Sequence, residues 1–360
     1  MKSANTVWKR TTISLLAFFV LTSCLFTSCG APSFIPDEGE NGDSSKDDIP
    51  VIAVPDVPPE PLFYNSYTGL VCDEEIATYR PLSICMGNFD GKQQNGLSFA
   101  DVLIEAPVES GETRLWMVTT AWRSIPSLSS LASARSYMMP IAHSLGAIAV
   151  YAGRGDKTKA QDALYAGDAI NTALPGGADA FWVDGEGIFT SGERLLARAT
   201  AEGFALTGVP TSLPYALAPT DKPFAPGGNP ITSIKIEYGV GKEALFTYQR
   251  TTSQYLAQRN GAAYGVGANG DSLTFSNVLI LFHNVNYYHT DTDSYFTLDT
   301  QAGGSGYCYT GGGVLRISWE YEEGQGLVLR TESGEKLMLN RGRTYISMMK
   351  VTDAQKIIAK

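Results

Sequence analysis

The sequence predicts an α+β protein with two domains: a mixed α/β domain over residues 63–206 and a mostly β domain over residues 231–352. Two observations carry this prediction. Strand-like and helix-like segments alternate in the first part, whereas short strands separated by glycine turns follow one another in the second. Six prolines between residues 207 and 230 interrupt the chain too often for a helix or a central strand, and they predict a linker there.

In the first domain, short apolar runs predict strands and segments of helical spacing predict helices. The strands are expected at residues 81–86, 101–105, 113–119 and 147–151, and the helices at 138–145, 157–166 and 192–201. In the second domain, alternating or continuous apolar runs predict strands. These runs cover residues 233–238, 277–282, 295–298, 314–321, 327–331, 336–339 and 344–349, with a hairpin turn at 332–335.

The first 29 residues are predicted to be a lipoprotein signal peptide. Three basic residues precede an apolar run at 13–21, which ends in two overlapping signals, Thr22-Ser23-Cys24 and Thr27-Ser28-Cys29. Small residues before a cysteine are typical of a bacterial chain that is cleaved before that cysteine and acylated on it, for example with palmitate. Cys29 is favoured because a flexible sequence follows it, and Cys24 remains the alternative. A short transmembrane anchor is a further alternative, although the run is well short of the roughly 20 residues that span a bilayer.

Residues 30–62 are predicted to form a disordered tether. Between residues 30 and 60 there are eight acidic residues, one lysine and six prolines. Such a segment buries too little apolar surface to offset the entropy cost of ordering. We interpret it as a solvated spacer that holds the folded part away from a membrane. An acidic docking segment is the alternative interpretation.

Charge and cysteine content exclude several classes of protein. The chain carries a net charge of −10, and its folded part is mildly acidic, so no basic surface for nucleic acid is expected. Cys72, Cys85 and Cys308 show no CxxC spacing, which argues against a thiolate metal site. One disulfide among the three is possible outside the cytoplasm. No cofactor is expected.

The order of several segments resembles that of one bacterial family. These segments are residues 65–70, Arg80-Pro81, 95–105, 108–114 and Ser133-Ala134-Arg135 in the first half, and Asn277-Val278, 304–306 and 334–346 in the second. Together they resemble the YerB-like bacterial lipoproteins, a family classed as a domain of unknown function. The resemblance covers nearly all of residues 64–350. It implies a two-domain envelope lipoprotein and no particular activity.

The strongest candidate site is a group of charged residues in the first domain: Asp101, Glu105, Glu109, Arg114 and Arg135. Asp101 and Glu105 flank a strand-like triplet at even spacing, so their side chains are expected on one side of that strand. Two carboxylates near an arginine could perform acid/base chemistry or hold a cation, and the arginine could bind a carboxylate or a phosphate. A structural ion-pair network is the alternative interpretation.

Other patterns give weaker signals. The segment from His283 to Asp293 gathers two histidines and two aspartates, but it lacks the standard metal-binding spacings. A solvated turn is therefore the more favoured interpretation of this segment. The serine-rich stretch at 127–136 lacks a GxSxG nucleophile motif, and the chain has three histidines in all. No catalytic residue is assigned.

These observations predict a lipid-anchored lipoprotein on the extracytoplasmic face of the cell membrane. Its expected role is that of a binding or scaffold module for an envelope protein, a peptide or a wall fragment. One alternative is a wall-directed hydrolase or transferase that uses Glu105 or Glu109 with Arg114 or Arg135. Another is a solute-capture lipoprotein.

Overall fold

The computed structural model describes residues 62–88, 94–153, 167–173, 176–185, 187–208, 224–264, 272–289, 294–322 and 326–360. The predicted signal peptide with Cys24 and Cys29, the predicted tether and the predicted helix at 157–166 lie outside these residues. The described residues belong to one compact unit that extends from Pro59 to Lys360. No helix within them is long and apolar enough to cross a bilayer.

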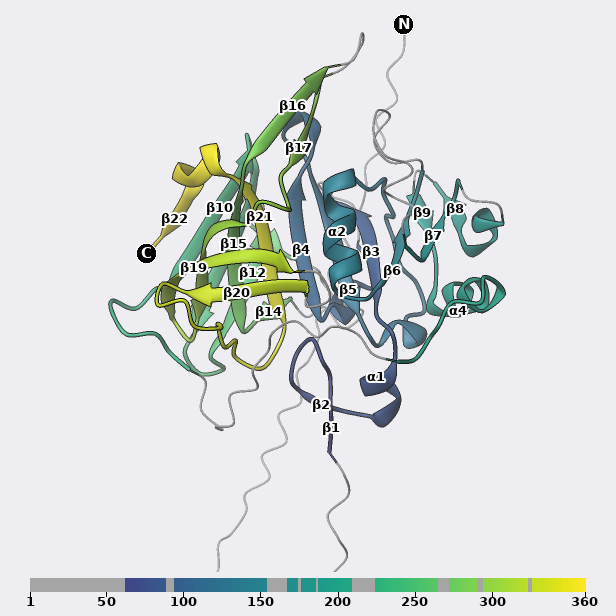
Figure 1. The fold of residues 1–360 in the computed structure, drawn as a ribbon, viewed down its shortest axis with the longest axis horizontal. Helices are drawn as coiled ribbons and strands as arrows, with labels where there is room; N and C mark the ends of the chain where they lie inside the picture. The colour runs from purple at the N-terminus through teal and green to yellow at the C-terminus, as the bar shows by residue number, and fades with distance from the viewer. Residues whose placement is uncertain are drawn as a thin grey trace, which may run out of the picture. The chain divides into compact units, whose positions relative to one another are not determined.

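A ten-stranded sheet forms the centre of this unit, in the order β20-β19-β18-β15-β21-β4-β5-β3-β6-β7 (Figure 1). Its strands are β3 (Leu82–Gly87), β4 (Val102–Pro107), β5 (Thr113–Thr119), β6 (Ile148–Tyr151), β7 (Ala169–Asn171), β15 (Asn277–His283), β18 (Gly304–Thr310), β19 (Gly313–Glu322), β20 (Gly326–Thr331) and β21 (Thr344–Lys350). Strand β21 lies between β15 and β4 and is parallel to both. Strand β21, the last strand of this sheet along the chain, therefore joins the two halves of the chain in one sheet.

A second sheet covers one face of the central sheet. It has the order β13-β12-β11-β10-β22, and β14 pairs with β12. Its strands are β10 (Ser233–Gly239), β11 (Lys242–Gln249), β12 (Gln254–Arg259), β13 (Ala262–Ala263), β14 (Thr274–Phe275) and β22 (Ile357–Ala359). In β10, Ile234, Ile236 and Tyr238 are buried and alternate with partly exposed residues, as expected for a strand with one face on a core. Ile234 and Ile236 share a core with Val278 and Ile280 of the central sheet.

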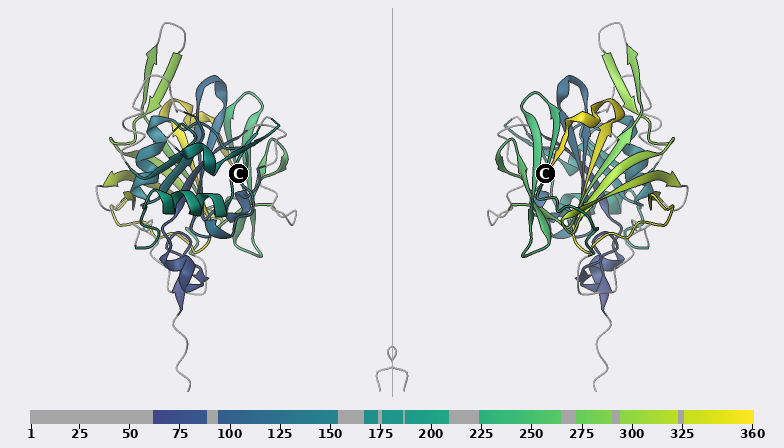
Figure 2. Two further views of the ribbon diagram at one scale, coloured as in Figure 1. Left: turned by 90° about the vertical axis from the view of Figure 1, so that its right-hand side faces the viewer. Right: turned by 90° about the vertical axis from the view of Figure 1, so that its left-hand side faces the viewer.

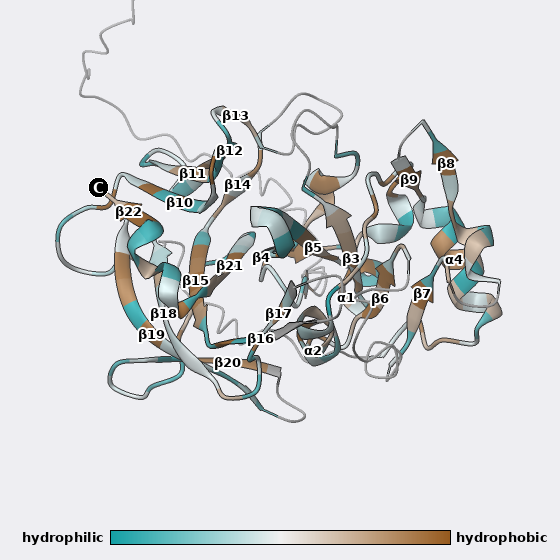
Figure 3. Ribbon diagram, turned by 90° about the horizontal axis from the view of Figure 1, so that it is seen from above, coloured by the Kyte–Doolittle hydropathy of each residue, from teal (hydrophilic) through white to brown (hydrophobic). Residues whose placement is uncertain are grey.

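On the opposite face of the central sheet lies the short helix α2 (Met139–Ser144), which contacts β6 and β20 (Figure 1). Leu298 and Leu339 add to the core on this face. Met139 and Ile141 pack there in the same core as Ile104 and Leu329. Strands β3 and β15 are buried along their whole length and are strongly hydrophobic (Figure 3). The inner strands of the central sheet are therefore covered on both faces, which explains their continuous apolar runs.

Smaller elements complete the unit. Helix α1 (Glu74–Thr78) follows the hairpin of β1 (Phe63–Tyr64) and β2 (Val71–Cys72). A second hairpin joins β8 (Trp182–Asp184) and β9 (Gly187–Phe189). A third joins β16 (Val285–His289) and β17 (Ser294–Leu298), and it projects from the rest of the unit (Figure 2).

Helix α4 (Gly192–Ala201) shows how local sequence fixes an element. The side chain of Ser191 accepts a hydrogen bond from the backbone N–H of Arg194 at 3.3 Å, which caps the first turn. Gly192 packs so closely that a Cβ atom there would lie 2.2 Å from the carbonyl oxygen of Trp122. Leu195 and Ala199 are buried one turn apart, so the helix presents one apolar stripe to the core.

The predicted fold class is confirmed, since a mixed first half is followed by a second half built mostly of strands. The strand expected at residues 336–339 is wrong. After β20, this segment keeps an isolated bridge between Arg330 and Lys336, together with a hydrogen bond from Leu337 N to Leu329 O. It then leaves the sheet edge because the backbone N–H of Asn340 binds the side-chain oxygen of Asn277, at 3.0 Å.

The two domains predicted from the sequence share one sheet in the structure. Residues 63–206 and 231–352 contribute strands to the same central sheet. Of the linker predicted at 207–230, the structure describes 207–208 and 224–230. Phe224 is held there by Asn340, whose side chain bonds both the backbone N–H and the carbonyl oxygen of Phe224 at 2.7 Å. The division into domains remains a prediction from the sequence.

Candidate functional site

Glu105, in β4, lies at the centre of a polar network between the two sheets. Its side chain is fully buried, and one carboxylate oxygen pairs with Arg259 at the end of β12. The same oxygen accepts hydrogen bonds from Asn88 at 3.0 Å and from Thr113 at 2.7 Å. The other oxygen accepts hydrogen bonds from two tyrosine hydroxyls, Tyr345 at 2.6 Å and Tyr264 at 3.2 Å. The first half of the chain thus supplies the carboxylate, and the second half supplies its cation.

The tyrosines extend this network through the core. The hydroxyl of Tyr238 contacts those of Tyr345 at 2.7 Å and Ser347 at 2.6 Å. Burial, together with the nearby Glu105 carboxylate, raises the pKa values of Tyr238, Tyr264 and Tyr345 well above the usual value. All three hydroxyls therefore stay protonated and can donate hydrogen bonds.

Arg259 remains charged in this environment. Burial alone would lower the pKa of its guanidinium, but the adjacent Glu105 carboxylate raises it above the ordinary value. The arginine also lies over the ring of Tyr238, with its central carbon 5.6 Å from the ring centroid. Glu105 is a paired and hydrogen-bonded charge without contact to solvent, so its position is that of a structural group.

Asp101 stabilises the beginning of the same strand. Its carboxylate accepts hydrogen bonds from Asn65 at 3.0 Å and from the backbone N–H and the hydroxyl of Thr120 at 2.7 and 2.9 Å. Burial raises the pKa of Asp101, and these hydrogen bonds oppose that rise. The side chain joins the segment before β2 to the end of β5, which is again a structural role.

Glu109 and Arg135 form a separate ion pair. Arg135 Nε lies 3.1 and 3.0 Å from the two carboxylate oxygens of Glu109, and Arg135 Nη2 lies 2.5 Å from one of them. The remaining guanidinium nitrogen donates to Ser133 and Ala134. The donors of Arg135 are thus largely used within the protein, in a two-pronged geometry that holds the end of β4 against residues 133–135.

Arg114 lies on the opposite side of the sheet from Glu105. It follows Thr113 in β5, and Thr113 faces Glu105, so the next side chain points to the other face. Arg114 and Arg135 both lower the pKa of Cys85, which burial nevertheless raises to about 12. The structure therefore divides the predicted cluster: it pairs Glu109 with Arg135, places Arg114 on their side of the sheet, and separates Glu105 and Asp101 into networks of their own.

The segment from His283 to Asp293 and the cysteines were the weaker candidates from the sequence. His283 is buried against Trp319, with ring centroids 4.3 Å apart, and its Nδ1 binds the carbonyl oxygen of Leu281 at 2.9 Å. Asp291 and Asp293 lie outside the described residues. The described ranges contain no group of three or more His, Cys, Asp or Glu side chains suited to a metal ion. Cys72, Cys85 and Cys308 are free thiols.

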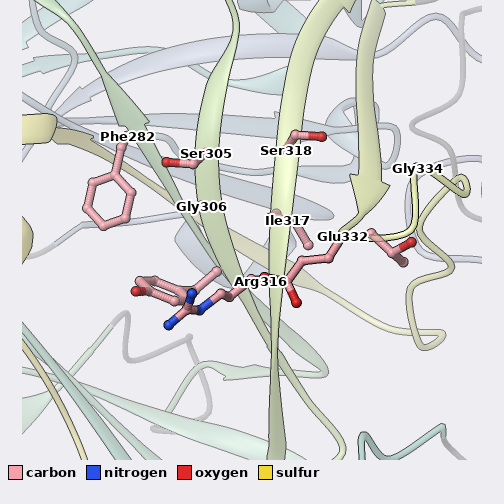
Figure 4. Close-up of a pocket in the computed structure, with 10 residues that line it drawn as sticks. Phe282, Ser305, Gly306, Arg316, Ile317, Ser318, Glu332 and Gly334 are labelled. Atoms are coloured by element: carbon pink, nitrogen blue, oxygen red, sulfur yellow. The ribbon is translucent and has the colours of Figure 1, made fainter.

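The sequence-based search missed a surface pocket of about 550 Å³ on the central sheet (Figure 4). Strands β15, β18 and β19, the end of β20 and the segment after it form the pocket. The lining residues are Phe282, Ser305, Gly306, Tyr307, Arg316, Ile317, Ser318, Thr331, Glu332 and Gly334. These residues come from separate strands, and each is an ordinary strand or turn residue in its own segment. The one sequence signal for this pocket was the alternation of apolar and polar residues at 314–321, in which Arg316 and Ser318 are polar.

The fold and these sites define a class: an α+β protein whose two halves share one sheet and are tied by a buried ion pair. The chain belongs to the family described as "Protein of unknown function (DUF3048)", whose N-terminal domain matches residues 67–205 and whose C-terminal domain matches residues 234–346. The resemblance noted from the sequence is thereby confirmed.

YerB of Bacillus subtilis supports this assignment both in sequence and in structure. The chain is 24% identical over 299 residues to "Putative lipoprotein YerB" of Bacillus subtilis (strain 168), covering 81% of this chain and 87% of that protein. It is also similar to the crystal structure of YerB protein from Bacillus subtilis, with a TM-score of 0.69 and 21% identity over 83% of this chain and 99% of that one. The second likeness shows the fold. The first agrees with the prediction of a lipoprotein whose activity is unknown.

The Glu105–Arg259 pair gives a stability prediction. Replacing Glu105 with Ala leaves a buried guanidinium without its counter-charge, and we expect a loss of about 3–5 kcal/mol in the free energy of unfolding, measured by urea denaturation. The double variant Glu105→Ala/Arg259→Ala should lose less than the two single losses added together. Glu320→Ala is the control, because it breaks an exposed pair with Arg330 and should change little. Strict additivity of the two single losses would contradict the coupling.

His283 gives a prediction about pH. Burial lowers the pKa of His283 to about 4, from an ordinary value of 6.5. Between these values the unfolded chain binds a proton that the folded chain does not, so stability falls as the pH decreases from about 6.5 to about 4. The loss amounts to about 3 kcal/mol, and His283→Phe should lack it. Urea denaturation of both proteins across this range tests the difference, and equal pH slopes would refute it.

Proposed function

We propose that this protein is a lipid-anchored binding module on the extracytoplasmic face of the cell membrane, where it binds a component of the cell envelope. The pocket on the central sheet carries the proposal. Its volume of about 550 Å³ lies within the range of small-ligand sites, and hydroxyl, guanidinium and carboxylate groups line it beside the rings of Phe282 and Tyr307. The N-terminal segment with Cys24 and Cys29, and a relative named as a lipoprotein, support the anchor.

The surroundings of the predicted acid/base residues favour binding over hydrolysis. A general acid or base must come within hydrogen-bond distance of its substrate. Glu105 is fully buried, and protein donors already surround its carboxylate. Glu109 is held by two nitrogens of Arg135. These contacts account for both carboxylates as stabilising groups.

The anchor is tested by metabolic labelling with a palmitate analogue in a bacterial host that processes lipoproteins. We expect Cys29→Ser to abolish labelling of the protein and membrane retention, because the acylated thiol is lost. Cys24→Ser is the matched control and should remain labelled. The reverse pattern would assign the anchor to Cys24 and keep the localisation. Labelling in neither the original protein nor the variants would overturn the lipid anchor.

The binding role is tested with the full chain in detergent and purified bacterial cell walls. We expect the protein to co-sediment with the walls without releasing soluble wall fragments, because it binds but does not cleave. Release of fragments that is lost in Glu109→Gln would instead support the hydrolase alternative. Failure to co-sediment would contradict binding to the wall.

A further inference from the structure

The pocket has two rows of side chains that are set by strand register. Ser305 of β18 lies directly opposite Ser318 of β19, and Tyr307 lies opposite Arg316. Paired residues in adjacent antiparallel strands point to the same face, and successive same-face rows lie roughly 7 Å apart. A hydroxyl row therefore runs beside a row that contains an aromatic ring and a cation. Figure 4 shows Ser305 and Ser318 at one end of the pocket and Arg316 with Glu332 at the other.

Arg316 differs from the arginine on the neighbouring strand. Arg330, in β20, is held by Glu320 at 3.2 Å and by Glu322 at 3.1 Å. Arg316 is exposed and has no ion-pair partner within the part of the chain that the structure describes. Its guanidinium can therefore form a two-pronged contact with an incoming carboxylate or phosphate without first giving up a protein partner.

The remaining lining favours a ligand rich in hydroxyl groups. The ring of Phe282 meets that of Tyr307 edge to face, with centroids 5.8 Å apart, and thus fixes the orientation of the Tyr307 ring. Ser305 and Ser318 offer both donors and acceptors, and Glu332 offers acceptors. Ile317 is the one aliphatic side chain among the described lining residues and is buried, so the apolar surface of the pocket comes mainly from the aromatic rings of Phe282 and Tyr307.

We propose that this pocket binds a saccharide that carries an anionic group. Arg316 pairs with the anion, the two serines and Glu332 bind ring hydroxyls, and Tyr307 contacts the apolar face of the ring. This inference rests on the proposed binding function and names the ligand class of that function. A cell-wall sugar bearing a carboxylate and a glycopolymer bearing a phosphate share this chemistry, so the test includes both.

The test compares N-acetylmuramic acid with N-acetylglucosamine, which lacks the carboxylate-bearing lactyl group. Ligand-observed NMR titrations use the full chain in detergent. We expect N-acetylmuramic acid to bind at least about tenfold more tightly, because a charge-assisted contact is among the stronger hydrogen bonds. Arg316→Gln should abolish this preference, whereas Arg330→Gln, the matched control on the neighbouring strand, should keep it. Melting temperatures confirm that both variants fold.

Three outcomes would overturn the inference. The first is equal binding of the two sugars by the original protein. The second is an unchanged preference for N-acetylmuramic acid in Arg316→Gln. The third is that glycerol phosphate, which has no sugar ring, binds as tightly as both N-acetylmuramic acid and glucose 6-phosphate. Tighter binding of glucose 6-phosphate than of N-acetylmuramic acid would support the saccharide class with a phosphate source. Co-sedimentation with cell walls distinguishes the proposed ligand class from the proposed binding function. If one of these outcomes is found but Arg316→Gln still co-sediments with walls, the ligand class is wrong and the binding function stands.

Discussion

Arg259 reaches Glu105 from the second sheet, and the pair is enclosed by Thr113 on one side and tyrosines on the other. Removing two charges from water costs several kcal/mol for each ion, and only close contact with added hydrogen bonds repays that cost. Such contacts form only when the two sheets are in one relative position. A shifted packing would leave a carboxylate and a guanidinium buried apart. The network thus selects a single arrangement of the two halves.

Backbone pairing of strand β21 favours the same arrangement of the two halves. It pairs with β4 from the first half and with β15 from the second, and its Tyr345 also contacts Glu105. Backbone and side chain therefore fix the same alignment. Because β21 follows nearly all other strands along the chain, these long-range contacts can form only late in synthesis, and loop-closure entropy opposes them until then.

Local elements could be predicted from the sequence, but the partners of the polar residues could not. The strand at 113–119 and the helix at 192–201 have the predicted bounds because their patterns are local. Glu105 was a candidate because it flanks a strand-like triplet at even spacing from Asp101, and the structure shows that its carboxylate is instead held by Arg259, Thr113 and Tyr345. Arg259, however, lies 154 residues away in a segment without an unusual motif. The pocket was missed for the same reason, since register between strands, and not spacing along one strand, brings Arg316 beside Tyr307.

The distribution of charge separates the stabilising groups from those available to a ligand. Asp101, Glu105 and Glu109 are satisfied by protein donors, so binding a ligand there would first break contacts that the fold uses. Arg316 has no such contact to lose among the described residues. It also lies on the long strand β19, which pairs with β18 on one side and with β20 on the other. A free charge on a paired strand gives up no protein contact when a ligand binds, which makes this pocket better suited to recognition than the buried carboxylates.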